Sequence, residues 1–61
     1  MKFIELTHDE SKQKILINVT HIVKITDYSG YRRIQMLNEW TTVLETMEQI
    51  KSILSPFTLN N

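Results

Sequence analysis

Hydrophobic and polar residues alternate along most of the first 44 positions of this chain, which is the period of strands that bury one face. The richest segment is 15–25, where seven aliphatic side chains are interrupted by the polar step at Asn18. We interpret it as two strands joined by one tight turn. The alternation predicts five short strands over residues 1–7, 13–18, 22–28, 31–37 and 40–44.

The predicted connections have their own signals. Val19 and Ile22 lie three positions apart, which predicts a single helical or 3₁₀ turn that Asn18 starts with its side-chain oxygen. Gly30 is the only glycine, and it predicts a hairpin around Ser29-Gly30 because a positive φ is least costly there. Residues 8–12 contain no apolar side chain and predict a solvated loop, and Asn38-Glu39 predicts a two-residue connection.

The period changes from strand to helix at Thr46. Thr46 and Gln49 are spaced as a capping box, and a predicted inward face follows at Met47, Ile50, Ile53 and Leu54. The residue before a proline is disfavoured in the α region, so we expect the helix to end near Leu54, ahead of Pro56.

The predicted fold class is therefore α+β: a small curled antiparallel sheet of about five short strands, with one C-terminal helix packed on one face. We assign residues 1–55 to a single domain and residues 56–61 to a C-terminal tail. The alternation places one set of side chains toward the helix and the core: Ile4, Leu6, Ile15, Ile17, Val23, Ile25, Ile34, Met36 and Val43.

The opposite face of the predicted sheet has no element of this chain to cover it. It mixes aromatic, aliphatic and basic side chains, a composition that is typical of protein interfaces and is also able to stack nucleic-acid bases. The predicted partner-binding residues on this face are Phe3, Leu16, Lys24, Tyr31, Arg33 and Trp40.

Composition narrows the function classes. Seven basic and seven acidic residues give a net charge of zero, so a general electrostatic attraction to nucleic acid or anionic membrane is absent. The chain has no cysteine and no apolar run of about 20 residues that would span a membrane. We expect a cytoplasmic protein.

Candidate catalytic chemistry is sparse. His8 and His21 fall in different predicted loops, and neither is spaced with another ligand as in a metal site. Ser11 and Ser29 have no histidine and carboxylate at motif spacing. We expect no enzymatic activity, no cofactor and no metal.

Three segments resemble the small flagellar proteins of the FlbD/SwrD type: Phe3-Ile4-Glu5-Leu6-Thr7, the strand 15–18 with the step 21–25, and the helix start 44–50. The resemblance covers nearly the whole chain. It implies a cytoplasmic accessory protein that acts through protein contacts and is associated with motor function in swarming bacteria. It implies no catalytic residue.

We therefore expect a non-enzymatic interaction protein that binds itself and a protein partner. A 61-residue chain has a marginal core, so we expect a homodimer or higher oligomer formed through the uncovered face or an open strand edge. Two alternatives stay open. The first is an inhibitor of a host enzyme or defence system encoded by a phage or mobile element, and the second is a small nucleotide- or nucleic-acid-binding module.

Overall fold

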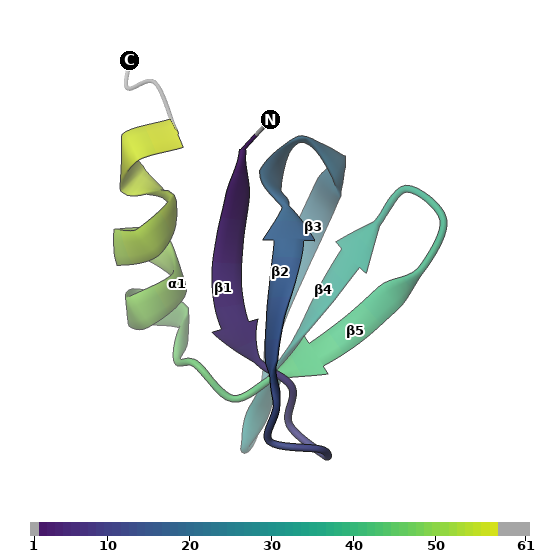
Figure 1. The fold of residues 1–61 in the computed structure, drawn as a ribbon. Coiled ribbons are helices and arrows are strands. Elements are labelled where there is room, and N and C mark those ends of the chain that lie inside the picture. Colours follow the sequence, from purple (N-terminus) through teal and green to yellow (C-terminus); the bar gives the residue numbers. More distant parts are fainter. Residues whose placement is uncertain (1, 58–61) are drawn as a thin grey trace.

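The computed structural model describes residues 2–57. This part of the chain contains five antiparallel strands followed by one α-helix, as Figure 1 shows, which confirms the predicted α+β class. The elements run in the order β1 (Phe3–Thr7), β2 (Lys14–Asn18), the 3₁₀ turn η1 (Val19–His21), β3 (Ile22–Tyr28), β4 (Tyr31–Met36), β5 (Trp40–Val43), α1 (Met47–Leu54) and the 3₁₀ turn η2 (Ser55–Phe57).

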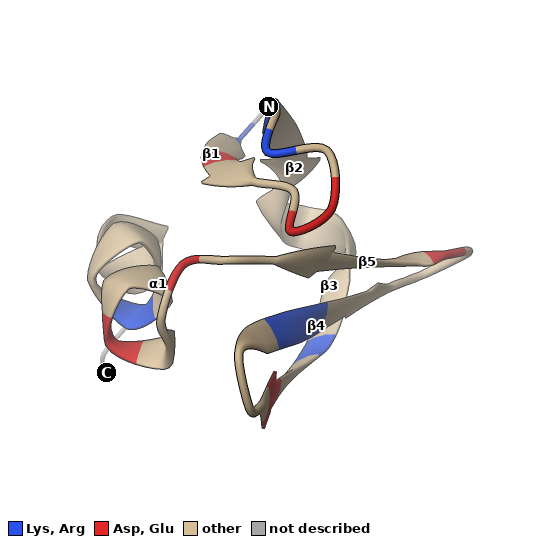
Figure 2. Ribbon diagram, turned by 90° about the horizontal axis from the view of Figure 1, so that it is seen from below, with Lys and Arg blue, Asp and Glu red and all other residues tan. Residues whose placement is uncertain are grey.

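The strands divide into two small sheets rather than the one continuous sheet that the sequence predicts. One sheet is the hairpin β1–β2, and the other is the meander β3–β4–β5. The two sheets touch at one end, where His8 pairs with Val43 and the Leu44 N–H donates to the Thr7 carbonyl at 2.9 Å. Beyond this junction β1–β2 lies across the meander, with α1 beside both (Figure 2). Alternation determines which side chains point inward, but it does not determine which strands pair with each other. The division into two sheets therefore cannot be recognised from any single segment of the sequence.

The core lies between the two sheets and the helix. Its buried side chains come from all three elements: Ile4, Leu6 and Ile17 from the hairpin, Ile34 and Val43 from the meander, and Ile50 from α1. All six belong to the predicted inward set. Ile53 and Leu54 of α1 are partly buried against the same cluster.

Val23 is the clear exception among the predicted inward residues. The register between β3 and β4 shifts between Ile22 and Lys24, which marks a β-bulge. A bulge inserts one extra residue and breaks strict alternation. The prediction for Val23 is therefore wrong: its side chain is 60% exposed, while Ile22 packs against the core.

The turns follow their sequence signals closely. Asn18 accepts a hydrogen bond from the Thr20 N–H and starts η1 as predicted. Gly30 has a φ of +88° in the β3–β4 hairpin, a conformation that costs L-residues energy. The β4–β5 connection is one residue longer than predicted, because β4 ends at Met36 and the Met36 N–H donates to the Glu39 carbonyl at 2.7 Å.

Helix α1 begins with the predicted capping box. The Thr46 hydroxyl accepts from the Gln49 N–H at 3.1 Å, and the Gln49 side chain accepts from the Thr46 N–H at 2.9 Å. The chain continues through Pro56 in η2, and Phe57 packs against the core. The rest of the predicted tail, 58–61, lies outside the described residues. No helix within residues 2–57 has the length and apolar character to cross a bilayer.

Candidate functional site

The outer face of the meander gathers most of the predicted partner-binding side chains. Strand register puts Lys24 opposite Gln35 and Gln35 opposite Trp40. One step further along, Arg33 lies between Thr26 and Thr42. Directly opposed residues of antiparallel strands project on the same side of a sheet. This face is thus a continuous row of polar, basic and aromatic side chains that points away from the core.

Four side chains on this face form one stacked group, which we call the aromatic surface: Tyr28, Tyr31, Arg33 and Trp40. The Tyr28 and Tyr31 rings stack with centroids 5.1 Å apart and planes inclined by 21°. The Arg33 guanidinium lies between two rings, with its Cζ 5.5 Å from the Tyr28 centroid and 5.7 Å from the Trp40 centroid. Both distances are within the range of cation–π attraction. The stacking links all three strands of the meander into one preorganised surface.

Arg33 keeps its charge uncompensated within the described residues. The neighbouring Arg32 pairs with Asp27 at 3.0 Å, whereas no carboxylate of the described part of the chain pairs with Arg33. The Arg33 Nε is buried and finds no hydrogen-bond acceptor there. A guanidinium that lies near two rings and lacks an anion suits a carboxylate or phosphate supplied from outside the molecule.

The structure separates the six predicted binding residues into two groups. Lys24, Tyr31, Arg33 and Trp40 share the outer face of the meander. Phe3 and Leu16 instead lie on the outer face of the β1–β2 hairpin, so the prediction of a single shared face is wrong for these two residues. The cause is the division of the strands into two sheets.

Tyr28 belongs to the aromatic surface but was not predicted to be a binding residue. A usable signal is present in the sequence, because Tyr28 and Tyr31 flank Ser29-Gly30. A two-residue hairpin places its flanking residues directly opposite each other, and the structure pairs Tyr28 with Tyr31.

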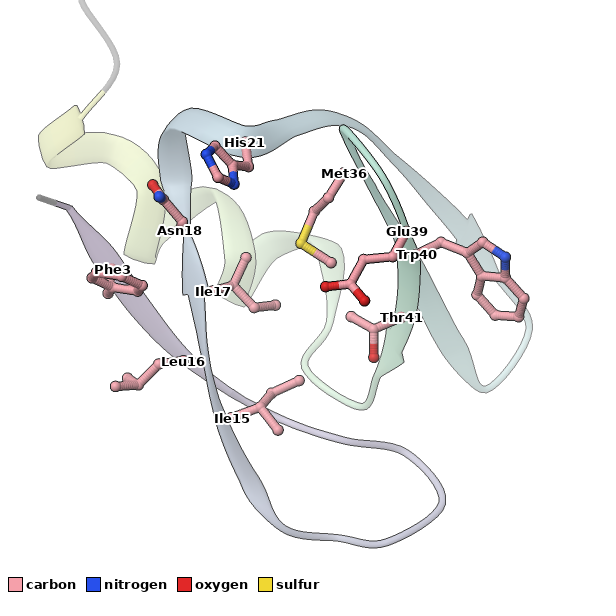
Figure 3. Close-up of a pocket in the computed structure, with 10 residues that line it drawn as sticks. All are labelled: Phe3, Ile15, Leu16, Ile17, Asn18, His21, Met36, Glu39, Trp40 and Thr41. Atoms are coloured by element: carbon pink, nitrogen blue, oxygen red, sulfur yellow. The ribbon is translucent and has the colours of Figure 1, made fainter.

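The hairpin β1–β2 presents a second, smaller apolar area, which we call the hairpin surface: Phe3 and Leu16. Leu16 is 69% exposed and Phe3 is 43% exposed. Figure 3 shows both side chains on the side of β2 opposite to Ile15 and Ile17. Glu5 lies directly opposite Leu16 on the same face. Among the described residues, however, no ring stacking or cation–π contact organises the hairpin surface, in contrast to the aromatic surface.

An open cavity of about 480 Å³ lies between β2 and the start of β5. Ile15, Ile17 and Met36 give it an apolar floor, and Glu39 and His21 stand at its margin (Figure 3). The Trp40 ring borders the cavity but points away from it. The lining thus combines apolar contact with one carboxylate and the polar side chains of Asn18, His21 and Thr41.

The loop between β1 and β2 is exposed at residues 10–12, as predicted, but its start is docked on β5 through Asp9. The Asp9 N–H donates to the Thr42 carbonyl at 3.2 Å, and the Asp9 carboxylate accepts from the Thr42 hydroxyl. The His8 Nδ1 lies 3.1 Å from the Ser11 N–H donor and 3.1 Å from the Ser11 hydroxyl. These polar groups therefore shape the loop, and they border a second cavity beside Tyr31 and Trp40.

Glu45 fastens the junction between the sheets. Its carboxylate accepts hydrogen bonds from the Thr7 N–H and the Thr7 hydroxyl, each at 2.8 Å. Partial burial raises the pKa of Glu45, but the hydrogen bonds from Thr7 and the nearby positive charge of Lys14 outweigh it, so that the pKa lies below its ordinary value. Thr7 engages both carboxylate oxygens, which gives Glu45 a structural role at the junction.

Within residues 2–57, no three side chains of the His, Cys, Asp or Glu type lie close enough together to hold a metal ion. No family model, no curated protein and no solved structure matches this chain.

Proposed function

We propose that this chain is a non-enzymatic interaction protein that binds a protein partner through the aromatic surface. The observation that carries the proposal is the Arg33 guanidinium held between the Tyr28 and Trp40 rings. Tyrosine, tryptophan and arginine are the residue types that dominate binding energy at protein interfaces. Trp40 is 58% exposed and Tyr28 is 37% exposed, so a partner has direct access to both rings.

Preorganisation supports the same proposal. Ordering a rotamer-rich side chain on binding costs about 0.5–1.5 kcal/mol, and a group that is already stacked has less of this cost left to bear. Arg33 is stacked before any partner arrives. Its unpaired charge favours a partner that brings an aspartate or glutamate to the centre of the contact.

The resemblance to the small flagellar proteins supports a function in this class, because it implies an accessory role through protein contacts. The flagellar association and the cytoplasmic location stay predictions. A phage-encoded inhibitor would use the same surface on a different partner, so the identity of the partner separates these two alternatives.

Site-specific photo-crosslinking tests the proposal. A photo-crosslinking amino acid is placed at Trp40, or at the matched position Leu37, in cells of the organism that encodes the chain. Leu37 is 64% exposed in the β4–β5 connection, outside the aromatic surface. We expect a discrete crosslinked protein from position 40 and none from position 37.

The captured protein is then purified and its affinity measured with substituted chains. We expect Trp40→Ala and Arg33→Ala to raise the Kd by about tenfold or more, because each removes an anchor of the stacked group. Leu37→Ala should leave the Kd unchanged. Equal losses for all three variants, or none for the first two, would contradict the proposal.

Nucleic-acid binding is a second candidate, favoured by the placement of Lys24 on the same face as Arg33 and the three rings. Basic and aromatic side chains together can stack bases and neutralise phosphates. With a net charge of zero, we expect this affinity to be weak and to have a shallow salt dependence. Sub-micromolar binding of a single-stranded oligonucleotide at physiological salt, lost in Arg33→Ala, would make nucleic acid the preferred ligand.

A further inference from the structure

Strand β2 has one edge that no described strand covers. Its other edge pairs with β1 in an unbroken register from Phe3 opposite Asn18 to Thr7 opposite Lys14. The flanking bonds, from the His8 N–H to the Gln13 carbonyl and from the Val19 N–H to the Lys2 carbonyl, fix which residues of β2 bond to β1. Hydrogen-bonded pairs alternate in an antiparallel ladder, so Ile15 and Ile17 bond to β1. The backbone groups of Lys14, Leu16 and Asn18 therefore face the open edge.

This edge lacks the usual protection against pairing. Exposed edges are commonly blocked by proline, by a bulge or by a charged side chain. Strand β2 contains no proline or glycine, and its ladder with β1 has no bulge. Its one charged residue, Lys14, turns toward its own sheet, where its Nζ donates to the Thr7 hydroxyl at 3.2 Å. The edge strand of the meander, β3, differs because it carries the bulge between Ile22 and Lys24.

Open space and exposed apolar area lie beside this edge. The cavity between β2 and β5 borders four consecutive residues of β2, from Ile15 to Asn18. Leu16, at the middle of the edge, is also the most exposed large apolar side chain of the described residues, at 69%. An incoming strand would find both unpaired backbone groups and an apolar contact there.

We propose that β2 pairs along this edge with β2 of a second copy of the chain, antiparallel and about a twofold axis at Leu16. The two hairpins then join into one four-stranded sheet. This register sets Leu16 opposite Leu16 of the second copy and Lys14 opposite Asn18. It also sets Ile15 opposite Ile17. The opposed residues are apolar with apolar and basic with neutral, so no like charges meet.

A second copy is the occupant that the sequence of this edge fits. A twofold contact requires a strand that is complementary to its own reverse, and residues 14–18 meet this condition around Leu16. The contact also brings the exposed Leu16 side chain against Leu16 of the second copy on the same face of the joined sheet. A domain of this size buries only about 60% of its unfolded surface, so additional apolar burial is valuable to it. The aromatic surface stays free for a different protein.

Placing a charge at Leu16, on the proposed twofold axis, tests the dimer directly. In a homodimer, Leu16→Glu sets two carboxylates against each other, and Leu16→Lys sets two ammonium groups against each other. We expect the wild-type chain to form dimers in sedimentation velocity at high micromolar concentration. Each variant alone should have a dimer Kd raised by about tenfold or more. An equimolar mixture of the two variants should form dimers again, because opposite charges then face each other.

Two controls keep the test specific. Val23→Glu adds the same charge at a 60% exposed residue of the other edge strand, and it should leave the dimer Kd unchanged. Trp40→Ala should also leave it unchanged. The Leu16 side chain points away from the core, so both variants should keep the wild-type circular dichroism spectrum.

Three outcomes would overturn the proposal: a monomeric wild type at every concentration, dimers of Leu16→Glu as tight as the wild type, or a mixture that stays monomeric. If Trp40→Ala abolishes the dimer while Leu16→Glu does not, the copies associate through the aromatic surface instead. Failure at Leu16 leaves the proposed partner binding through the aromatic surface untouched, because the two tests use different residues and different readouts.

Discussion

The two sheets of this protein have similar inner faces and different outer faces. Toward the core, both present aliphatic side chains that are almost fully buried, such as Leu6 in the hairpin and Ile34 in the meander. Toward solvent, the meander carries a stacked arginine and aromatic rings, whereas the hairpin exposes the apolar Phe3 and Leu16 next to the charged Glu5 and Lys14. The inner faces are determined by the fold. The outer faces are free to differ, and their difference points to two kinds of contact.

The edges of the sheets differ in the same sense. The hairpin is regular over all five residue pairs and open at β2, while the meander is interrupted by a bulge in its edge strand β3. A regular open edge offers backbone hydrogen bonds, and a stacked face offers side-chain anchors. We therefore expect the hairpin to associate through backbone pairing and the meander through side-chain contacts.

The largest expected effect tests whether the two sheets share one core. Ile50 is fully buried in the cluster to which both sheets contribute, so Ile50→Ala should lower the free energy of unfolding by about 2–5 kcal/mol. Hydrogen exchange should show both sheets losing protection together. Lys51→Ala, on the exposed side of α1, should change stability by less than about 0.5 kcal/mol. Separate unfolding of the meander and the hairpin would show that they are independent units.

A smaller effect is expected where the sheets are joined. Glu45→Gln removes the charge that accepts two hydrogen bonds from Thr7, which should cost about 1 kcal/mol at neutral pH. The pKa of Glu45 is lower in the folded chain than its ordinary value of 4.5. The ionised carboxylate therefore stabilises the fold above that value, and this stabilisation is lost as the pH falls through the lower, folded-state pKa.

Chemical denaturation at a series of pH values measures this contribution. The stability of the wild type should decline on acidification, and the decline should be shallower in Glu45→Gln. Glu48→Gln, an exposed residue in the first turn of α1, is the control. Parallel pH profiles for the wild type and Glu45→Gln would mean that this carboxylate does not hold the junction.

The smallest effect compares the two outer faces directly. Arg33→Met removes the cation between the rings and should lower stability by about 0.5–1 kcal/mol. Leu16→Ala, measured in dilute solution where the chain is monomeric, should change stability by less than about 0.5 kcal/mol because its side chain makes little contact. Equal effects in thermal melts would remove the distinction between an organised and an unorganised face.

Local signals in the sequence predict most of the fold. Alternation gives all five strands with ends that differ from the observed ones by at most two residues, Asn18 predicts η1, and the Thr46–Gln49 spacing predicts the start of α1. The division into two sheets could not be predicted in this way, because alternation does not show that β2 and β3 stay unpaired. The pairing that joins the sheets, between His8 and Val43, connects residues far apart in the chain. The bulge that exposes Val23 is also set by pairing across strands.

The candidate site was predicted only in part, because it too depends on which strands pair with each other. Side chains on neighbouring strands of the meander, such as Arg33 and Trp40, follow from alternation once the strands are adjacent. Phe3 and Leu16 belong to another sheet, and the alternation of hydrophobic and polar residues does not predict how two sheets are placed relative to each other. The stacking of Arg33 between rings depends on rotamers, which a residue pattern does not specify.

The junction held by Thr7 and Glu45 has a consequence for how the chain folds. Each sheet is built from neighbours in sequence, so the hairpin and the meander can form from short loops, whereas the junction joins residues 38 positions apart. The entropy lost in closing a loop grows with its length and has to be compensated by contacts made afterwards. We therefore expect the rate-limiting event in folding to be the docking of the two preformed sheets, together with the packing of α1 against both of them.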